Sequence, residues 1–336
     1  PGDLEKLSRG DHYGSNFSRM ILPDGHERTQ ADVVATDHAI AILETRAGRG
    51  PPGATNRTRL KDGSPFFLAV GFVRPHVPHI APARHFARYP HEEAPLPFVP
   101  EDDLEDVPPE ARRTGNAVAA RFGMDPVQQQ KAIAAYHASV SFMDEQLGRL
   151  LDALDRLDLR RRTIVVFTSD HGFNLGEHSC WQKSSLWEES VRVPLIVSVP
   201  GTGNAGAQTP AIVELLDLYP TFAELTGLGP EAPSILQGKS LLPLVRSPGV
   251  PRPGFAAYTL TSGGASLRTP RWRYTRWGEE ATIHNEELYD HERDPGEFRN
   301  LARDPAYSAE LLDLRARFEK RRRAARHRPG PVVSAP

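Results

Sequence analysis

Three continuous runs of apolar residues stand out along the chain and indicate buried strands. The runs cover residues 66–72, 163–168 and 194–199. Short apolar runs without polar interruptions suit strands that are covered on both faces, as in a parallel sheet. Proline and glycine are concentrated at 75–110 and 200–253, and we expect these stretches to form surface loops.

Apolar residues spaced three or four positions apart predict helices around these strands. The longest such stripe runs from Ile133 to Leu157, between the first two strands, and shorter ones lie at about 31–47 and 211–226. Strands that alternate with helices are typical of an α/β fold with a doubly wound, mostly parallel sheet. We expect residues 1–249 to form a domain of this class.

The pattern changes after about residue 250, where short polar-aromatic segments replace the long apolar runs. These segments lie at 255–261, 266–268, 271–277 and 287–290, and a helical stripe follows at about 305–324. We expect residues 250–336 to form a small antiparallel sheet with one helix. The basic run 320–328 is most simply a solvated helix end.

Composition narrows the possible functions. The chain has 336 residues, with 41 Lys and Arg against 43 Asp and Glu. The length allows two domains, and the balanced charge argues against a nucleic-acid partner. No run approaches the roughly 18 apolar residues that a membrane span needs, so we expect no membrane span. A single cysteine, Cys180, excludes an intramolecular disulfide and a cysteine-based zinc cluster.

The start of the chain carries no targeting signal. It opens at Pro1 without an initiator methionine, a basic segment or an apolar segment. No secretion signal is visible, and we expect the natural N-terminus to lie upstream. The residues alone leave the compartment and the oligomeric state open.

The clearest candidate for chemistry follows the second strand. Asp170 and His171 come directly after residues 163–168, and ligands bind at the carboxyl ends of the strands in an open α/β sheet. A carboxylate oxygen and an imidazole nitrogen suit a divalent cation, and Gly172 permits a tight turn that would aim both at it. The alternative, that Asp170 only turns the chain after a strand, fits these residues equally well.

Two further loops carry candidate side chains. Arg74 and His76 follow the first strand, and the prolines beside His76 stiffen its loop, which favours a functional imidazole over a half-exposed loop histidine. The polar stretch 174–183 ends at Lys183, whose ammonium could meet an anion near the cation, although a solvated surface lysine is commoner. Cys180 has no adjacent base, which favours an incidental small residue over a nucleophile.

Several motifs agree in order with one known family. Ser169-Asp170-His171-Gly172 is followed by Leu175-Gly176-Glu177-His178 and by Trp181-Gln182-Lys183, and further matching segments lie at 65–76, 136–144, 193–196, 214–221 and 287–301. In these motifs the chain resembles the sulfatase family of the alkaline-phosphatase superfamily, most of all its iduronate-2-sulfatase branch and the bacterial relatives of that branch. The resemblance covers most of the chain from about residue 30 to 302.

The resemblance implies a sulfuric ester hydrolase that acts on a sulfated carbohydrate such as a uronate 2-sulfate. Asp170 and His171 would be ligands of one divalent cation, Ca²⁺ by family, with Mg²⁺ as the alternative. Lys183 would contact the sulfate. His76 would bind sulfate or protonate the departing alcohol oxygen, because an imidazole can give or take a proton near neutral pH.

The resemblance also places three residues near a substrate pocket, namely Arg74, Glu177 and His178. Specificity for one sugar would come from the loops 77–125 and 173–190 and from the C-terminal subdomain. Proteins of this family are commonly periplasmic, extracellular or lysosomal, which makes a periplasmic or extracellular location the expectation by resemblance.

The sequence departs from the family at the nucleophile. Sulfatases use a formylglycine made from Cys or Ser in a Cys/Ser-x-Pro-x-Arg motif, and no such motif occurs in these 336 residues. The paired Asp ligands of the family's first strand are missing as well. We therefore expect the chain to be the C-terminal portion of a sulfatase, with residues 1–249 from the catalytic domain, and to be inactive by itself.

Two other functions stay open. One is a phosphodiesterase or phosphonate hydrolase of the same superfamily, which a Thr nucleophile upstream would indicate. The other is a catalytically inactive, sulfatase-like protein that binds sulfated glycans, and its binding would be insensitive to calcium removal.

Overall fold

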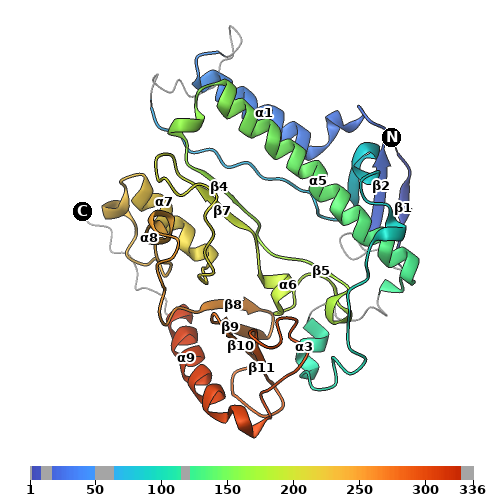
Figure 1. The fold of residues 1–336 in the computed structure, drawn as a ribbon, viewed down its shortest axis with the longest axis vertical. Coiled ribbons are helices and arrows are strands. Elements are labelled where there is room, and N and C mark those ends of the chain that lie inside the picture. Colours follow the sequence, from blue (N-terminus) through green and yellow to red (C-terminus); the bar gives the residue numbers. More distant parts are fainter. Residues whose placement is uncertain (1, 9–16, 50–63, 115–121, 327–336) are drawn as a thin grey trace, which may run out of the picture. The chain divides into compact units, whose positions relative to one another are not determined.

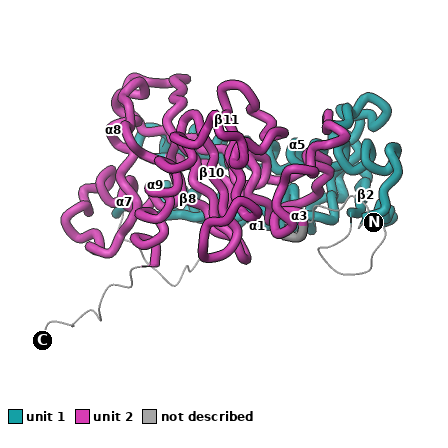
Figure 2. The backbone as a smooth tube through the Cα atoms, turned by 90° about the horizontal axis from the view of Figure 1, so that it is seen from below, with its two compact units in different colours: residues 1–97, 119–164 teal, residues 98–118, 165–336 magenta. Residues whose placement is uncertain are grey.

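The computed structural model describes residues 2–8, 17–49, 64–114 and 122–326 (Figure 1). The chain divides into two compact units, which Figure 2 colours separately. The first comprises residues 1–97 and 119–164, and the second comprises residues 98–118 and 165–336. The expected domain boundary at 249/250 does not coincide with this division and stays a prediction. None of the described helices combines the length and the apolar character that crossing a membrane requires.

Two long helices dominate the first unit and lie side by side (Figure 1). They are α1 (Ala31–Arg46) and α5 (Pro126–Arg156), and both confirm the helices that the apolar spacing predicts. The start of α5 is encoded locally. The Asp125 carboxylate accepts a hydrogen bond from the Gln128 N–H at 2.9 Å, and the Gln128 side chain accepts one from the Asp125 N–H at 2.9 Å.

The first unit also holds a three-stranded sheet that the apolar pattern does not predict. Its strands are β1 (Leu4–Lys6), β2 (Ser18–Leu22) and β3 (His79–Pro82), in the order β1-β2-β3. β1 and β2 are antiparallel, whereas β2 and β3 are parallel. The short helix α2 (Ala83–Phe86) follows β3 directly.

The predicted strand at 66–72 is wrong, because none of the described strands pairs with this segment. Its side chains alternate between half-buried and exposed, and Phe67 is 81% exposed. An apolar run makes a strand only where a neighbour completes its hydrogen bonds. Asp32 of α1 instead fixes the end of the segment, since its carboxylate accepts hydrogen bonds from the N–H groups of Val73 at 2.6 Å and Arg74 at 3.1 Å.

The other two predicted strands are confirmed as β4 (Val165–Thr168) and β7 (Leu195–Ser198). They pair with each other, but the pairing is antiparallel, so the expected parallel arrangement is wrong for these two strands. A parallel pair needs a crossover of about a dozen residues, usually a helix. Here the chain between them forms only short elements, namely β5 (Asn174–Leu175), β6 (Trp181–Gln182) and α6 (Glu188–Val191), and returns beside β4.

The predicted helix at 211–226 is shorter than expected. It appears as α7 (Leu218–Leu225), after a 3-10 turn at Leu215–Asp217. Glu214 precedes this turn with an extended backbone, and its carboxylate accepts a hydrogen bond from the Tyr258 N–H at 2.7 Å. Two other short helices of the second unit are α3 (Pro109–Thr114) and α8 (Leu242–Arg246).

The expected antiparallel sheet with one helix is confirmed in the C-terminal part of the second unit (Figure 1). Its strands are antiparallel in the order β11-β10-β9-β8. They are β8 (Ala257–Thr261), β9 (Gly264–Arg268), β10 (Trp272–Trp277) and β11 (Glu286–Asp290), and the helix is α9 (Ser308–Arg326).

Both faces of this sheet are buried. One core cluster joins Tyr274 and Leu288 of the sheet to Phe318 of α9. Trp277 and Tyr289, whose side chains alternate with these along β10 and β11, belong to a second cluster that contains Cys180, Leu186 and Trp187. The sheet therefore supports the loop that carries the predicted site residues of the second unit.

Burial on both faces brings a charged side chain into the interior. Arg273 of β10 is 1% exposed and forms close ion pairs with Glu188 and Glu297. His291 lies 2.6 Å from the Glu297 carboxylate. Burial by itself would raise the pKa of Glu297, but the charge of Arg273 and the bonds from His291 and Arg273 outweigh it and lower the pKa to about 2.

We expect Glu297→Gln to lower the free energy of unfolding by about 3–5 kcal/mol, because it leaves the buried Arg273 charge with one carboxylate partner fewer. The contribution of Glu297 to the free energy of unfolding is fully present above 4.5, the ordinary pKa of a glutamate, and is lost as the pH falls toward 2. Urea unfolding of the wild type and the variant at several pH values measures both effects. Arg161→Ala, at a side chain that is 85% exposed, serves as the control and should cost less than about 0.5 kcal/mol.

Candidate functional site

Asp170 and His171 follow β4 directly, as the sequence predicts. The Asp170 carboxylate lies 3.7 Å from Nε2 of His171 and is 86% exposed. Nδ1 of His171 lies 2.7 Å from the Gly172 carbonyl oxygen, which can only accept, so Nδ1 carries a proton and Nε2 is the ring nitrogen that could bind a metal ion. A hydrogen bond of this kind is the usual way in which a metal-ligating histidine is oriented. The donor set therefore fits two ligands of one divalent cation.

Glycine is required next to this pair because the backbone of α6 approaches closely. A Cβ atom at Gly172 would lie 1.9 Å from the Glu189 carbonyl oxygen. The Gly172 N–H donates to the Ser190 carbonyl at 2.8 Å, and the Phe173 N–H donates to the Glu189 carbonyl at 2.7 Å. These contacts tie the Asp170-His171 turn to α6.

Lys183 follows β6 in the hairpin formed by β5 and β6. The backbone on either side of it is unusual, since Gln182 has φ of 74° and Ser184 has φ of 82°. Residues other than glycine seldom adopt the left-handed region, and they remain there only where the surroundings hold them. Within the part of the chain that the structure describes, no ion pair of Lys183 is found.

Glu177 and His178 lie at the tip of the same hairpin and contact protein groups. The Glu177 carboxylate accepts a hydrogen bond from the Leu175 N–H at 2.6 Å. His178 is 1% exposed, its Nδ1 lies 3.1 Å from the Asp103 carboxylate, and its ring stacks on Trp187 with centroids 4.4 Å apart. Burial this complete argues against direct contact between His178 and a substrate. The expected place of His178 near a substrate pocket stays a prediction.

The buried histidine retains its charge through its partner. Burial lowers the pKa of His178, but the hydrogen bond and the charge of Asp103 outweigh that effect, and the pKa lies above its ordinary value of 6.5. The neighbouring carboxylates Glu189 and Glu297 act in the same direction. The raised pKa thus favours the charged form of His178 beside Asp103.

Arg74 and His76 lie in the first unit, after the segment that ends at Val73. Nη1 of Arg74 donates to the carbonyl oxygens of His76 at 2.9 Å and Pro78 at 3.1 Å, which folds the loop around the guanidinium. Nδ1 of His76 lies 2.7 Å from the Val77 carbonyl and carries the proton, so Nε2 is the ring nitrogen left for a ligand. The loop holds His76 in one orientation, as its prolines predict.

The structure thus brings together two groups of predicted residues. Asp170 and His171 are adjacent, and Lys183 shares a hairpin with Glu177 and His178. Arg74 and His76 belong to the other compact unit, and their approach to the first groups stays a prediction.

Sequence reasoning missed the partners of His178. Asp103 lies in a proline-rich loop and Trp187 in a polar stretch, and neither has a spacing that links it to the histidine. It also missed a cluster of Glu188, His291 and Glu297, whose ligand atoms lie within 4.8 Å of one another. The guanidinium of Arg273 pairs with both carboxylates of that cluster, which favours an ion-pair network over a cation site there.

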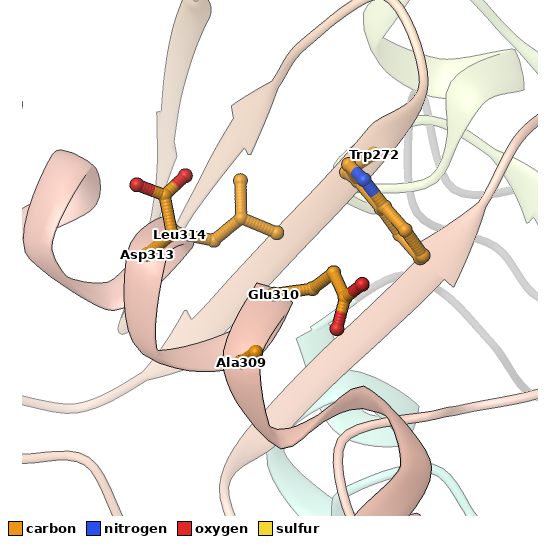
Figure 3. Close-up of a pocket in the computed structure, with 5 residues that line it drawn as sticks. All are labelled: Trp272, Ala309, Glu310, Asp313 and Leu314. Atoms are coloured by element: carbon orange, nitrogen blue, oxygen red, sulfur yellow. The ribbon is translucent and has the colours of Figure 1, made fainter.

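A hollow of about 280 Å³ lies between β10 and α9 (Figure 3). It is lined by Trp272, Ala309, Glu310, Asp313 and Leu314. The two carboxylates would repel a sulfate ester, so this hollow does not fit the predicted substrate group.

We expect Asp103→Asn to lower the pKa of His178 below 6.5, because burial would then act without a counter-charge. The stabilisation from this pair is present below the ordinary pKa of histidine and is lost as the pH rises through the raised pKa of His178. Titration of the imidazole resonances by NMR measures the shift. A pKa that stays above 6.5 in the variant would show that Asp103 is not its cause.

Cys180 is completely buried, and burial raises the pKa of its thiol. We expect a thiol reagent such as an aromatic disulfide to react with the unfolded chain at least about 100-fold faster than with the native one, because the thiolate is the nucleophile. The time course of labelling with and without denaturant gives the ratio. Equal rates would contradict the burial of this side chain.

Comparisons with known proteins identify the family of the chain. A family model described as sulfatase matches residues 54–228, and one described as N-sulphoglucosamine sulphohydrolase, C-terminal, matches residues 176–324. The second match overlaps the hairpin, the C-terminal sheet and α9, which form one compact unit here.

Relatives and solved structures point the same way. A sulfatase of Formosa agariphila is 35% identical over 259 residues, covering 76% of this chain and 50% of the relative. Human iduronate 2-sulfatase is 32% identical over 387 aligned positions, covering 89% of this chain and 67% of the relative. A solved structure in complex with its substrate D-glucosamine-2-N,6-O-disulfate has a TM-score of 0.73 at 23% identity, covering 96% of this chain and 76% of that one.

The chain spans half of the length of the first relative and about two thirds of the second. The family match covers more than half of the residues, from 54 to 228, and includes the Asp170-His171 turn and Lys183. The α/β fold expected from the sequence is shared with the solved structure. This chain belongs to the sulfatase family.

Proposed function

We propose that the chain is the C-terminal portion of a sulfuric ester hydrolase that acts on sulfated carbohydrate, with a uronate 2-sulfate as the first candidate. The observation that carries the proposal is the Asp170-His171 turn at the end of β4, where a carboxylate oxygen and Nε2 of the imidazole lie 3.7 Å apart. The substrate class is supported by the similarity to iduronate 2-sulfatase, at 32% identity.

Asp170 and His171 would hold one Ca²⁺ ion, or Mg²⁺ in its place. When bound, the ion would supply positive charge beside the sulfate oxygens, on which negative charge grows as the ester bond breaks. Ca²⁺ takes about six to eight ligands, so this pair provides only part of the site. The remaining ligands and the formylglycine nucleophile would come from the segment that the family carries before this region.

Lys183 would contact the sulfate through its ammonium, and the left-handed backbone on either side of it would fix the direction of the side chain. His76 would bind sulfate or, as the imidazolium, donate the Nε2 proton to the departing alcohol oxygen, while Nδ1 keeps its own proton and its hydrogen bond to the Val77 carbonyl. Arg74 would shape the same loop. Glu177 would border the pocket, and His178 would support it from the interior.

We expect the chain by itself to give no turnover of an aryl sulfate, because it has no formylglycine motif. Sequencing the coding DNA upstream of Pro1 should find an Asp-Asp pair and a Cys/Ser-x-Pro-x-Arg motif in frame, and the extended protein should hydrolyse aryl sulfates. A start codon without that segment would contradict the proposal and favour a glycan-binding protein. Faster turnover of a phosphonate ester than of a sulfate would favour the phosphonate hydrolase.

In the extended protein, Lys183→Ala should lower kcat/KM for the sulfate ester by about 100-fold or more, since a charge that stabilises the transition state is removed. Lys239→Ala is the matched control, because Lys239 is an exposed lysine of the same unit.

A chelator should abolish turnover, and added Ca²⁺ should restore it. The periplasmic or extracellular location is tested by fractionation of cells that express the extended gene.

A further inference from the structure

Several residues of the hairpin that carries Lys183 have a left-handed backbone conformation. Of the six described residues other than glycine with positive φ, four lie at 178–184. They are His178, Ser179, Gln182 and Ser184, with φ between 52° and 82°. A conformation of this kind persists only where other contacts hold it, so the contacts of this hairpin must be strong.

The strongest of these contacts converge on one imidazole. The His178 ring is paired through Nδ1 with Asp103, at 3.1 Å, and it stacks on Trp187 with an interplanar angle of 18°. Phe298 approaches the same ring, with centroids 5.5 Å apart. His178 and Asp103 are 1% and 2% exposed as side chains.

These contacts lie on both sides of Lys183 in the sequence. Lys183 lies between His178 and Trp187, so the stacked pair fastens the backbone on both sides of the lysine. The ladder between β5 and β6, with Asn174 opposite Gln182, closes the hairpin just before it. Ser185 then donates to the Asn174 side chain at 3.2 Å just after it.

We propose that His178 and Asp103 are positioning residues, whose buried pair, closed by the Trp187 indole, holds the strained backbone that presents Lys183 to a sulfate group. The proposal rests on the proposed function for the contact between Lys183 and sulfate. In this proposal His178, the histidine of the Gly176-Glu177-His178 motif, supports Lys183 and does not contact the substrate.

The test uses the whole chain and the variants His178→Ala and Asp103→Asn, of which the second keeps the size of the side chain. Two quantities are measured. One is the amide hydrogen exchange of residues 176–186. The other is the shift of the Lys183 signal on addition of inorganic sulfate, followed by NMR after ¹³C-dimethylation of the six lysines and assigned with Lys183→Arg.

Both variants should raise exchange within 176–186 by at least about tenfold over the wild type, and both should weaken the sulfate-dependent shift of Lys183. The matched control is His85→Ala, which removes a buried histidine paired with Glu145 at 2.9 Å in the first unit. It should leave both quantities of the hairpin unchanged. The Lys239 signal should respond equally to sulfate in all proteins.

Unchanged exchange and an unchanged Lys183 response in folded Asp103→Asn would overturn the proposal. It would also fail if the exchange of the second unit rose uniformly, since that pattern means general destabilisation. If sulfate does not shift the Lys183 signal of the wild type but exchange is still faster in the variants, the sulfate contact is contradicted. The positioning role is then still supported.

Discussion

The sheet of β8 to β11 is buried on both faces, so charged side chains on its strands cannot reach solvent. This constraint determines how the second unit packs. β10 turns alternate side chains to opposite faces, so Tyr274 packs toward α9 while Arg273 and Trp277 face the other way. An interior guanidinium must be paired, because the cost of removing a charge from water amounts to several kcal/mol. Arg273 pairs with Glu188, which starts α6, and α6 holds the Asp170-His171 turn through the Glu189 and Ser190 carbonyls.

A second interior ion pair supports the hairpin above that sheet. Four residues at 178–184 occupy the left-handed region, which costs on the order of 1–3 kcal/mol each. The hairpin ladder of two residues on each strand is too short to offset such a cost. The pair of His178 with Asp103 and the stacking on Trp187 supply the missing stabilisation, and Cys180 fills the space beneath them as a small apolar group.

The sequence predicted the longer helices and the C-terminal sheet because their signals are local. Apolar spacing marks α1 and α5, and alternating polar-aromatic segments mark β8 to β11. Pairing is not local, which is why the direction of β7 against β4 and the absence of an assigned strand at 66–72 could not be predicted. Asp170, His171 and Lys183 were found through short motifs, whereas Asp103 reaches His178 across 75 positions without any pattern.

The exposure of the Asp170 carboxylate limits what the candidate cation site can do with these two ligands. Attraction between exposed charges is weak in water, and Asp170 is 86% exposed. A hard cation exchanges its hydration shell only where several carboxylate oxygens surround it, and the pair supplies one carboxylate and one imidazole. The hydrogen bond of Nδ1 to the Gly172 carbonyl would orient Nε2 of His171 toward such an ion. The affinity for a cation would therefore come from further carboxylates, while the Asp170-His171 turn would fix the direction of its two ligands.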